Sequence, residues 1–399
     1  MTSDVLIVGG GPAGMVAGLL FARAGVRTLV LEKHQDFLRD FRGDTVHPST
    51  LTIFDELGLL DRLLEVPHDK VHQLGGRVAG QPLRIADFSH LPVAAPYIAM
   101  MPQWDFLDFV ADAAGRYPGF TLRRNTQAEA LIEEDGRVSG VRLAGGEEVR
   151  ARLVIAADGR RSVLRDQSGL PSKTIGAPMD VFWFRLPKPR GETNDSMGVF
   201  DTGLILAMID RGDYWQCAFV FPKGSVDKAR AAGLDAFRAR IAGAAPELAG
   251  LTGAIASWDD VKLLTVTVDR LEKWHRPGLL VIGDAAHAMS PIGGVGINLA
   301  VQDAVAAANA LAGPIAAGHD PDPLLHKVED RRLLPTRLIQ GAQKAAQDRI
   351  IAPLLAGAAP LERPPLAARL LNRYAWLRRI PARAIGMGFR PEHVRSPEA

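Results

Sequence analysis

Residues 4–14 read Asp-Val-Leu-Ile-Val-Gly-Gly-Gly-Pro-Ala-Gly, a short apolar run followed at once by a glycine-rich turn. The apolar run predicts a buried strand, and the pattern that continues to Ala24 predicts a helix. A second apolar run, residues 26–31, ends in Glu32. Strand, Gly-x-Gly-x-x-Gly, helix, strand and acid in this order are typical of a dinucleotide-binding unit. The sequence therefore predicts an α/β fold with a Rossmann-like parallel sheet.

Each glycine of this turn has an expected task. Gly9 makes the tight turn, Gly11 lets the backbone approach a pyrophosphate, and Gly14 lets the helix pack closely on the strand. Glu32 is expected to accept a hydrogen bond from a ribose hydroxyl. Its charge would repel a 2′-phosphate, so the nucleotide bound here is not expected to be NADP.

Two later stretches also place an aspartate and a glycine at the end of a buried strand. Asp158-Gly159 follows the apolar run 153–157, and Gly283-Asp284 follows the run 279–282. Between residue 283 and the helix pattern that begins near Ile297, the chain is rich in glycine, which suits a loop pressed against a ligand. That helix would offer free N–H groups and its positive dipole end to an electron-rich group. Asp284 is placed to accept a hydrogen bond from a ligand hydroxyl.

Composition narrows the class of protein. With 399 residues, 47% apolar and 23% charged, the chain predicts a globular protein of two domains. A net charge of +2 gives no reason to expect nucleic acid binding. Cys217 is the single cysteine, which favours a reducing compartment and a cytoplasmic protein. No uncharged apolar run is long enough to span a bilayer, and no metal-ligand spacing is present, so neither a membrane span nor a metal is expected.

Taken together, the motifs resemble those of the single-component FAD-dependent aromatic hydroxylases, the flavoprotein monooxygenases typified by para-hydroxybenzoate hydroxylase. The resemblance covers about residues 1–320 and rests on the motifs at 9–14, 157–165 and 283–298. It implies tightly bound FAD, with NAD(P)H as a transient co-substrate and O2 as the oxidant. It also implies hydroxylation of an electron-rich aromatic substrate (phenolic, polyketide or quinone-like) through a flavin hydroperoxide.

Pattern and resemblance together predict a discontinuous Rossmann-like FAD-binding domain of the GR2 type, interleaved with a smaller antiparallel-sheet substrate domain and followed by C-terminal helices. The FAD-binding domain is expected in residues 1–70, 97–170 and 272–320. The substrate domain is expected in residues 71–96 and 171–271, and the helical segment in 321–399. Within residues 171–271 one helix is expected over about 225–242, and prolines such as Pro314 and Pro335 are expected to break the later helices.

The resemblance also implies a set of site residues. The cofactor-binding residues are expected to be Gly9, Gly11, Pro12, Ala13, Gly14, Glu32, Lys33, Arg42, Gln103, Asp158, Asp284, Gly294, Gly296, Ile297 and Asn298. Pro291 lies where the family places the substrate near the flavin. His47 is a second catalytic candidate, although a hydrogen-bonded structural histidine is the alternative. Arg211 and Tyr214 are candidates by location alone.

Three alternatives remain open. A flavin-dependent halogenase shares the nucleotide loop, but residues 182–187 match its Trp-x-Trp-x-Ile-Pro marker only in part. An isoprenoid-chain reductase shares the fold, and a non-catalytic protein could bind flavin and an aromatic ligand. The partners expected are a small aromatic substrate and O2, in a monomer or homodimer. The series Gln340, Gln343 and Gln347 predicts a polar helix stripe, either solvated or at a helix–helix contact.

Overall fold

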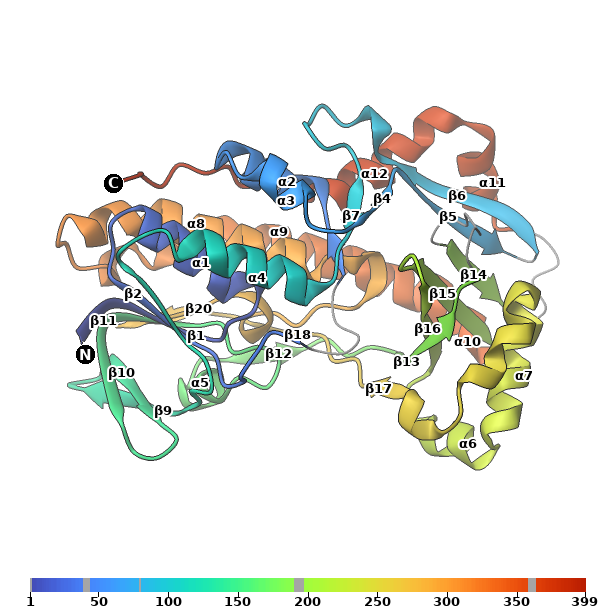
Figure 1. Cartoon of the computed structure of the whole chain (residues 1–399), viewed down its shortest axis with the longest axis horizontal. Helices are drawn as coiled ribbons and strands as arrows, with labels where there is room; N and C mark the ends of the chain where they lie inside the picture. The colour runs from blue at the N-terminus through green and yellow to red at the C-terminus, as the bar shows by residue number, and fades with distance from the viewer. Residues whose placement is uncertain (1, 39–43, 79, 190–196, 358–363) are drawn as a thin grey trace.

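The computed structural model describes residues 2–38, 44–78, 80–189, 197–357 and 364–399, and its two main sheets lie next to one another along the long axis of the molecule (Figure 1). Within the described residues the first sheet has eight strands, with a parallel core in the order β20-β11-β1-β2-β8. Its strands are β1 (Thr2–Val8), β2 (Thr28–Leu31), β8 (Phe120–Arg123), β9 (Ala128–Glu134), β10 (Arg137–Leu143), β11 (Glu148–Ala156), β19 (His275–Arg276) and β20 (Leu279–Val281).

Helices cover one face of the parallel sheet because its central strands are apolar on both sides. Helices α1 (Pro12–Arg23), α4 (Gln103–Ala114) and α8 (Gly296–Ala316) pack there in one large apolar cluster. The other face packs against the β9–β10 hairpin and the buried ring of Trp274. The segment Ile292–Ala316 is long and apolar enough to cross a membrane, but 83% of its apolar 18-residue window is buried inside the molecule.

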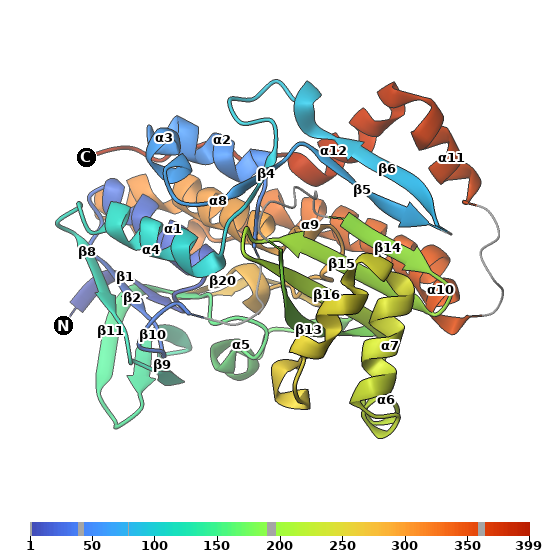
Figure 2. The same ribbon diagram turned by 45° about the vertical axis from the view of Figure 1, so that its right-hand side comes forward.

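The second sheet is mainly antiparallel and has seven strands in the part of the chain that the structure describes. These strands are β5 (Gln73–Val78), β6 (Gln81–Asp87), β13 (Met179–Pro187), β14 (Met197–Asp201), β15 (Leu204–Asp210), β16 (Tyr214–Pro222) and β17 (Lys262–Leu264). Figure 2 shows α7 (Leu234–Ala244) lying across this sheet. Phe182 and Phe219 pack under Phe237 of α7, so that face is a closed core.

Smaller elements join the two sheets. A three-stranded sheet is formed by β3 (Thr45–Val46), β4 (Asp69–Val71) and β7 (Ile98–Met100), and β12 (Ser172–Thr174) pairs with β18 (Asp269–Leu271). The short helices α2 (Pro48–Glu56), α3 (Leu60–Leu64) and α5 (Val163–Gln167) lie beside the parallel sheet, and α6 (Val226–Ala231) precedes α7. The helix expected over 225–242 is therefore two helices, because Gly233 at φ +89 interrupts it.

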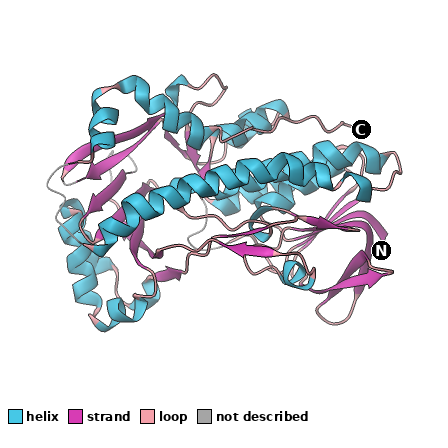
Figure 3. Cartoon of the chain, turned by 180° about the vertical axis from the view of Figure 1, so that it is seen from behind, coloured by secondary structure: helices cyan, strands magenta, loops and turns pink. Residues whose placement is uncertain are grey.

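The C-terminal segment is helical, as expected, but two prolines do not break it. Its helices are α9 (His326–Ala346), α10 (Ala352–Ala356), α11 (Leu366–Arg373) and α12 (Arg379–Gly386). Pro314 lies inside α8 and Pro335 inside α9, which contradicts the expected breaks. Each proline removes one backbone hydrogen bond, and tertiary packing of the long helix outweighs that loss. Figure 3 shows the long helices running from one sheet toward the other.

Candidate functional site: three loops and a small-residue sheet face

The first loop, between β1 and α1, packs tightly against the protein at Gly14 and borders open space at Gly11. A Cβ on Gly14 would lie 1.9 Å from the carbonyl oxygen of Gly9, so no larger residue fits there. Among the residues that the structure describes, a Cβ on Gly11 would meet nothing within 4 Å. Helix α1 has Pro12 in its first turn, no acidic residue there and no side-chain cap. Its free N–H groups therefore face an open space that suits a pyrophosphate.

Glu32 lies at the end of β2 and is almost fully buried beside this loop. Its carboxylate accepts hydrogen bonds from the backbone N–H of Gly10 at 2.9 Å and of His34 at 3.0 Å. These bonds fix the carboxylate next to the glycine turn, where a ribose would follow a bound pyrophosphate. Lys33, the next residue, is exposed.

The second loop places Asp158 after β11 and at the start of α5. The hydroxyl of Ser162 donates to the Asp158 carboxylate at 2.5 Å, and the backbone N–H of Arg165 donates to the same hydroxyl oxygen at 2.9 Å. Burial raises the pKa of Asp158 above its ordinary value, and the hydrogen bond from Ser162 opposes that rise. Asp158 therefore orders the loop from which Arg160 extends.

Arg160 connects the second loop to the third, across 124 residues of sequence. Its Nε donates to Asp284 Oδ2 at 3.0 Å, and its Nη2 donates to the carbonyl oxygen of Met289 at 3.3 Å. Its Nη1 is buried without a partner among the residues that the structure describes. Asp284 is about one third exposed. The carboxylate of Asp284 and the unpaired Nη1 of Arg160 thus lie close together at the start of the third loop.

The third loop runs from Gly283 to Val295, and its backbone carbonyls are bound by side chains from several elements. Thr45 Oγ1 donates to the Gly294 oxygen at 2.7 Å, and His47 Nε2 lies 3.1 Å from the same oxygen. Gln343 Nε2 on α9 contacts the oxygens of Ser290 and Ile292 at 3.0 and 2.8 Å.

The stripe formed by Gln340 and Gln343 of α9 and Gln347 just after it is buried, which corrects the expectation of a solvated or helix–helix stripe. Gln340 and Gln347 are each 2% exposed. Gln340 Nε2 donates to the carbonyl oxygens of Asp269 and Ala288 at 2.8 and 3.3 Å. The stripe therefore fastens α9 to the third loop. The spacing of the three glutamines on one helix face was the available signal, but it does not say what the face contacts.

A second buried network holds the base of the third loop. Asp303 on α8 is fully buried and accepts from the backbone N–H of Gly283 at 3.1 Å and from Arg332 Nε at 2.9 Å. His287 Nε2 lies 2.5 Å from the same carboxylate, and Arg332 also lies 3.5 Å from Glu392. Burial raises the pKa of Asp303, but His287 and Arg332 outweigh that effect and hold the pKa below its usual range. The chain's end thus supports the residue that precedes Asp284.

The first turn of α8 has no side-chain cap and no acidic residue, although the loop before it is so heavily bound. Gly296, Ile297 and Asn298 form this turn. The Asn298 side chain is turned toward α2, where its oxygen accepts from Ser49 at 2.5 Å and from Thr50 at 2.9 Å. The backbone N–H groups of the turn therefore remain for a ligand with an electron-rich edge.

The four catalytic candidates occupy different surroundings. Pro291 is partly exposed in the third loop. His47 is fully buried, with Nδ1 2.9 Å from the carbonyl oxygen of Ile385, and burial lowers its pKa to about 4. These contacts give His47 a structural task, and its catalytic role stays a prediction. The Tyr214 ring lies 4.9 Å below the guanidinium of Arg185.

Arg211 lies in a buried polar cluster between the second sheet and the residues before β3. Its guanidinium forms an ion pair with Asp44, and its Nε donates to Gln216 Oε1 at 3.2 Å. Gln216 Nε2 in turn donates to Asp44 at 2.7 Å. Burial raises the pKa of Asp44, although the charge of Arg211 opposes that rise, and the Gln103 backbone also bonds this carboxylate. Arg211 Nη1 has no partner in the described part of the chain. Arg42 falls outside the described residues.

One face of the second sheet carries a row of small residues opposite the third loop. The strand register places Trp183 beside Ala218, Ala218 beside Ala207, and Ala207 beside Gly198. Ile292 of the third loop packs in the same apolar cluster as Trp183, Ala207 and Ala218. We name the row Ala218, Ala207 and Gly198 the small-residue floor. At a strand spacing of ~4.8 Å it is about 10 Å long, and the ring of Phe200 lies over its Gly198 end.

Comparison with known proteins decides the family. The family model for an "FAD binding domain" matches residues 2–342. The chain belongs to the FAD-dependent aromatic monooxygenase family. Among curated members, it is 35% identical to a 6-methylpretetramide 4-monooxygenase of Streptomyces rimosus over 76% of this chain and 74% of that protein. It is 27% identical to an aklavinone 12-hydroxylase of Streptomyces peucetius, over 90% and 77% of the two chains.

Solved structures agree with this monooxygenase fold. An anhydrotetracycline hydroxylase from Streptomyces rimosus superposes with a TM-score of 0.73 at 25% identity, covering 97% of this chain and 76% of that one. A probable FAD-dependent monooxygenase from Pseudomonas aeruginosa gives a TM-score of 0.77 at 22% identity, covering 90% and 98% of the two chains. At 22% identity, the likeness to the Pseudomonas aeruginosa protein shows the fold alone. The α/β class, the parallel sheet, the antiparallel sheet and the C-terminal helices are thus confirmed.

Proposed function

We propose that this monooxygenase hydroxylates a planar polycyclic aromatic substrate of the polyketide kind, with NAD(P)H and O2 as co-substrates. The observation that carries the proposal is the pair of small residues Ala218 and Ala207 opposite the third loop, while the ring of Phe200 bounds this row at its Gly198 end. The polyketide hydroxylases among the relatives support the same substrate class. Bound FAD would supply reduction by the nicotinamide and activation of oxygen.

The chain's own residues fit FAD. The open space at Gly11 and the uncapped start of α1 suit the pyrophosphate, and Glu32 suits the adenosine ribose. Asp284 is assigned to the ribityl chain, and the first turn of α8 to the pyrimidine edge of the flavin. The remaining cofactor contacts proposed are Pro12, Ala13, Gly14, Lys33, Arg42, Gln103, Asp158, Gly294, Gly296, Ile297 and Asn298.

On the substrate side, we assign Arg211 Nη1 to an oxygen of the bound ring, whose negative charge it would stabilise as the phenolic proton leaves. Pro291 and the small-residue floor would hold the ring between loop and sheet and exclude water. Tyr214 would form part of the wall beside Arg211. His47 is retained as a catalytic candidate that acts only through the third loop.

The domain division proposed from the sequence is kept. The eight-stranded sheet falls within residues 1–70, 97–170 and 272–320, and the seven-stranded sheet within 71–96 and 171–271, for the strands that the structure describes. A cytoplasmic location, supported by the single cysteine, and a monomeric or homodimeric state are proposed with it.

The test begins with the visible spectrum of the purified protein and continues with oxygen uptake in the presence of NADPH or NADH. Tetracyclic phenols should stimulate uptake and gain one oxygen atom by mass, whereas monocyclic phenols should stimulate it little. Halide-dependent product would favour the halogenase, and substrate binding without uptake would favour the non-catalytic protein.

A variant that fills the floor links the activity to the sheet. Ala207→Phe should keep the flavin spectrum and lose stimulation by tetracyclic phenols. Ala231→Phe, on the exposed helix α6, is the matched control and should behave like the wild type. Retained stimulation in Ala207→Phe would place the substrate elsewhere.

A further inference from the structure

The C-terminal helices present an exposed surface that the proposed hydroxylation does not use. Between Leu366 and Arg390 the sequence has six arginines and no aspartate or glutamate. Six large apolar side chains in this stretch are exposed. Four of them are aliphatic side chains or tryptophan: Leu366, Leu370, Trp376 and Ile380, with exposed fractions of 67, 39, 60 and 64%. We name these four, with the exposed arginines 369, 373, 379 and 383, the C-terminal surface.

The inner sides of the same helices are fully used. Ala368 and Ala382 are buried, and α11 and α12 both pack on β6. Asn372 fixes this contact, because its Oδ1 accepts from the Arg84 backbone at 2.8 Å and its Nδ2 donates to the Pro82 oxygen at 2.6 Å. The folded core therefore accounts for one side of the helices, and no described residue covers the apolar side chains on the other side.

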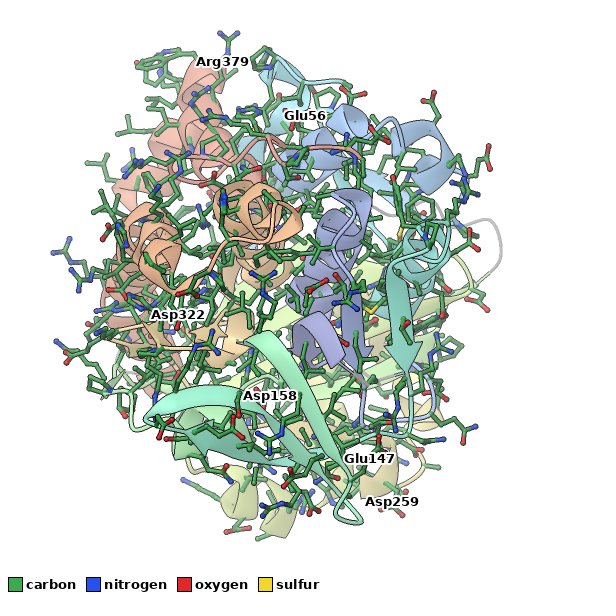
Figure 4. All side chains as sticks on the ribbon, turned by 90° about the vertical axis from the view of Figure 1, so that its left-hand side faces the viewer. Glu56, Glu147, Asp158, Asp259, Asp322 and Arg379 are labelled. Carbon is green, nitrogen blue, oxygen red and sulfur yellow. The ribbon has the colours of Figure 1, made fainter. Side chains whose placement is uncertain are left out.

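The arginines have few contacts inside the protein. Arg373 Nε donates to the Tyr374 hydroxyl at 3.4 Å, and its guanidinium lies 5.6 Å from the Tyr374 ring. Among the residues that the structure describes, none of arginines 369, 373, 379 and 383 forms an ion pair. Arg379 extends outward at the edge of the molecule in Figure 4. Leu366 and Leu370 are one helical turn apart, and Arg369 and Arg373 follow the same spacing beside them. Apolar and cationic side chains are thus interleaved on an open face.

We propose that the C-terminal surface docks on the surface of an anionic lipid bilayer. Exposed leucine, isoleucine and tryptophan with arginine in amphipathic helices are the composition of interfacial helices, in which the apolar side chains enter the acyl boundary and the cations bind lipid phosphates. Nucleic acid would leave the leucines and isoleucine without a favourable environment. A second copy of this chain is disfavoured as the partner. In a two-fold dimer this surface would face itself, and its arginines would lie opposite one another with no acidic residue to pair with.

Docking in this way would bring the substrate sheet close to the lipid. The helices rest on the β5–β6 hairpin, which is the edge of the sheet that carries the small-residue floor. A flat apolar substrate partitions into a bilayer, so an enzyme bound there would meet a higher local concentration of it. The proposal itself concerns binding and stands whether or not the hydroxylation is correct.

The test is co-sedimentation of the purified holoprotein with vesicles of phosphatidylcholine alone and of phosphatidylcholine mixed with phosphatidylglycerol. Binding should be at least about tenfold tighter to the anionic vesicles and should fall with added salt. The combined variant Arg369→Glu, Arg373→Glu, Arg379→Glu and Arg383→Glu should lose about tenfold or more in affinity for the anionic vesicles. Leu366→Ser with Trp376→Ser should also weaken binding, whereas Leu334→Ser with Leu338→Ser, exposed on α9, should not.

FAD content and thermal unfolding check that each variant is folded. Equal binding to both vesicle types, or unchanged binding of the two C-terminal variants, would overturn the proposal. So would a dimer in sedimentation velocity that these variants dissociate, because the surface would then be a contact between copies. Selective capture of the wild type by an acidic protein, without vesicle binding, would also overturn it.

Discussion

Two glycines in the first loop should respond to alanine in opposite ways, because one faces protein and the other faces open space. A Cβ at position 14 would lie 1.9 Å from the Gly9 oxygen, whereas a Cβ at position 11 would have no neighbour within 4 Å in the described part of the chain. Gly11 has φ −78 and ψ −177, which an alanine adopts without strain. Gly11→Ala should therefore not lower the stability of the FAD-free protein and should obstruct only the binding of a ligand.

The expected magnitudes follow from these contacts. Without FAD, Gly11→Ala should change the free energy of unfolding by at most about 1 kcal/mol, and in the stabilising direction. Gly14→Ala should cost about 3 kcal/mol, because a backbone carbonyl cannot move aside as a side-chain tip can. Displacing the pyrophosphate from the α1 N–H groups should cost Gly11→Ala about 2–4 kcal/mol of FAD binding, roughly 30- to 700-fold in Kd.

The assay combines guanidinium unfolding of the FAD-free proteins with a fluorescence titration of FAD. Gly11→Ala is expected to unfold like the wild type and to bind FAD poorly, and Gly14→Ala to unfold early. If Gly11→Ala retained FAD with unchanged Kd, no phosphate would occupy the space beside Gly11, and the assigned position of the cofactor would be wrong. If Gly14→Ala were as stable as the wild type, the packing argument would fail.

Three further changes test the network around the third loop. Asp303→Asn should lower the free energy of unfolding, measured by chemical denaturation, by about 3–5 kcal/mol, because Arg332 would stay buried without its full charge partner. The control Asp348→Asn, in an exposed pair with Lys344, should change it by less than about 1 kcal/mol. Gln343→Leu should leave the carbonyls of Ser290 and Ile292 unbound and cost about 1–3 kcal/mol of stability. It should also speed FAD dissociation in a stopped-flow assay. Unchanged FAD release would show that α9 does not hold the third loop in place. The folded pKa of His47 is about 4, below its unfolded value near 6.5, so its contribution is complete above pH 6.5 and is lost as the pH falls toward 4. Between pH 7.5 and 5 the wild type should therefore lose about 2 kcal/mol more stability than His47→Asn, and parallel pH profiles would contradict this.

The parallel sheet and the nucleotide loop could be predicted because their signals are local. Gly9, Gly11 and Gly14 lie within six residues of one another, and the strand, helix and acid around them follow in sequence order. The antiparallel sheet was likewise visible as alternating runs with turn residues between them. Helix continuity at Pro314 and Pro335 could not be predicted, because tertiary packing of a long helix outweighs the local cost of one proline.

The side-chain contacts that hold the site in place could not be predicted from the sequence, because the residues that form each contact lie far apart along the chain. Arg160 and Asp284 belong to motifs that were recognised, yet nothing local says that one side chain binds the other. Asp303, Arg332 and Glu392 are ordinary residues of helices and a tail until folding buries them together. The small-residue floor exists only in the strand register, where Ala218, Ala207 and Gly198 become neighbours across three strands.

The third loop shows why the C-terminal helices belong to the site. Its carbonyl oxygens are bound from three directions: by Arg160 of the second loop, by Thr45 and His47 before α2, and by Gln343 of α9. These acceptors are occupied, and several N–H groups of the loop are bound as well, so the free donors next to the loop are those of the uncapped start of α8, which also adds its dipole. A surface of this kind favours a group that gains negative charge when it is reduced, and it needs no rearrangement at that moment because its donors are already fixed. Loosening α9 should therefore shift the reduction potential of the bound cofactor to more negative values, even though no residue of α9 has to touch it.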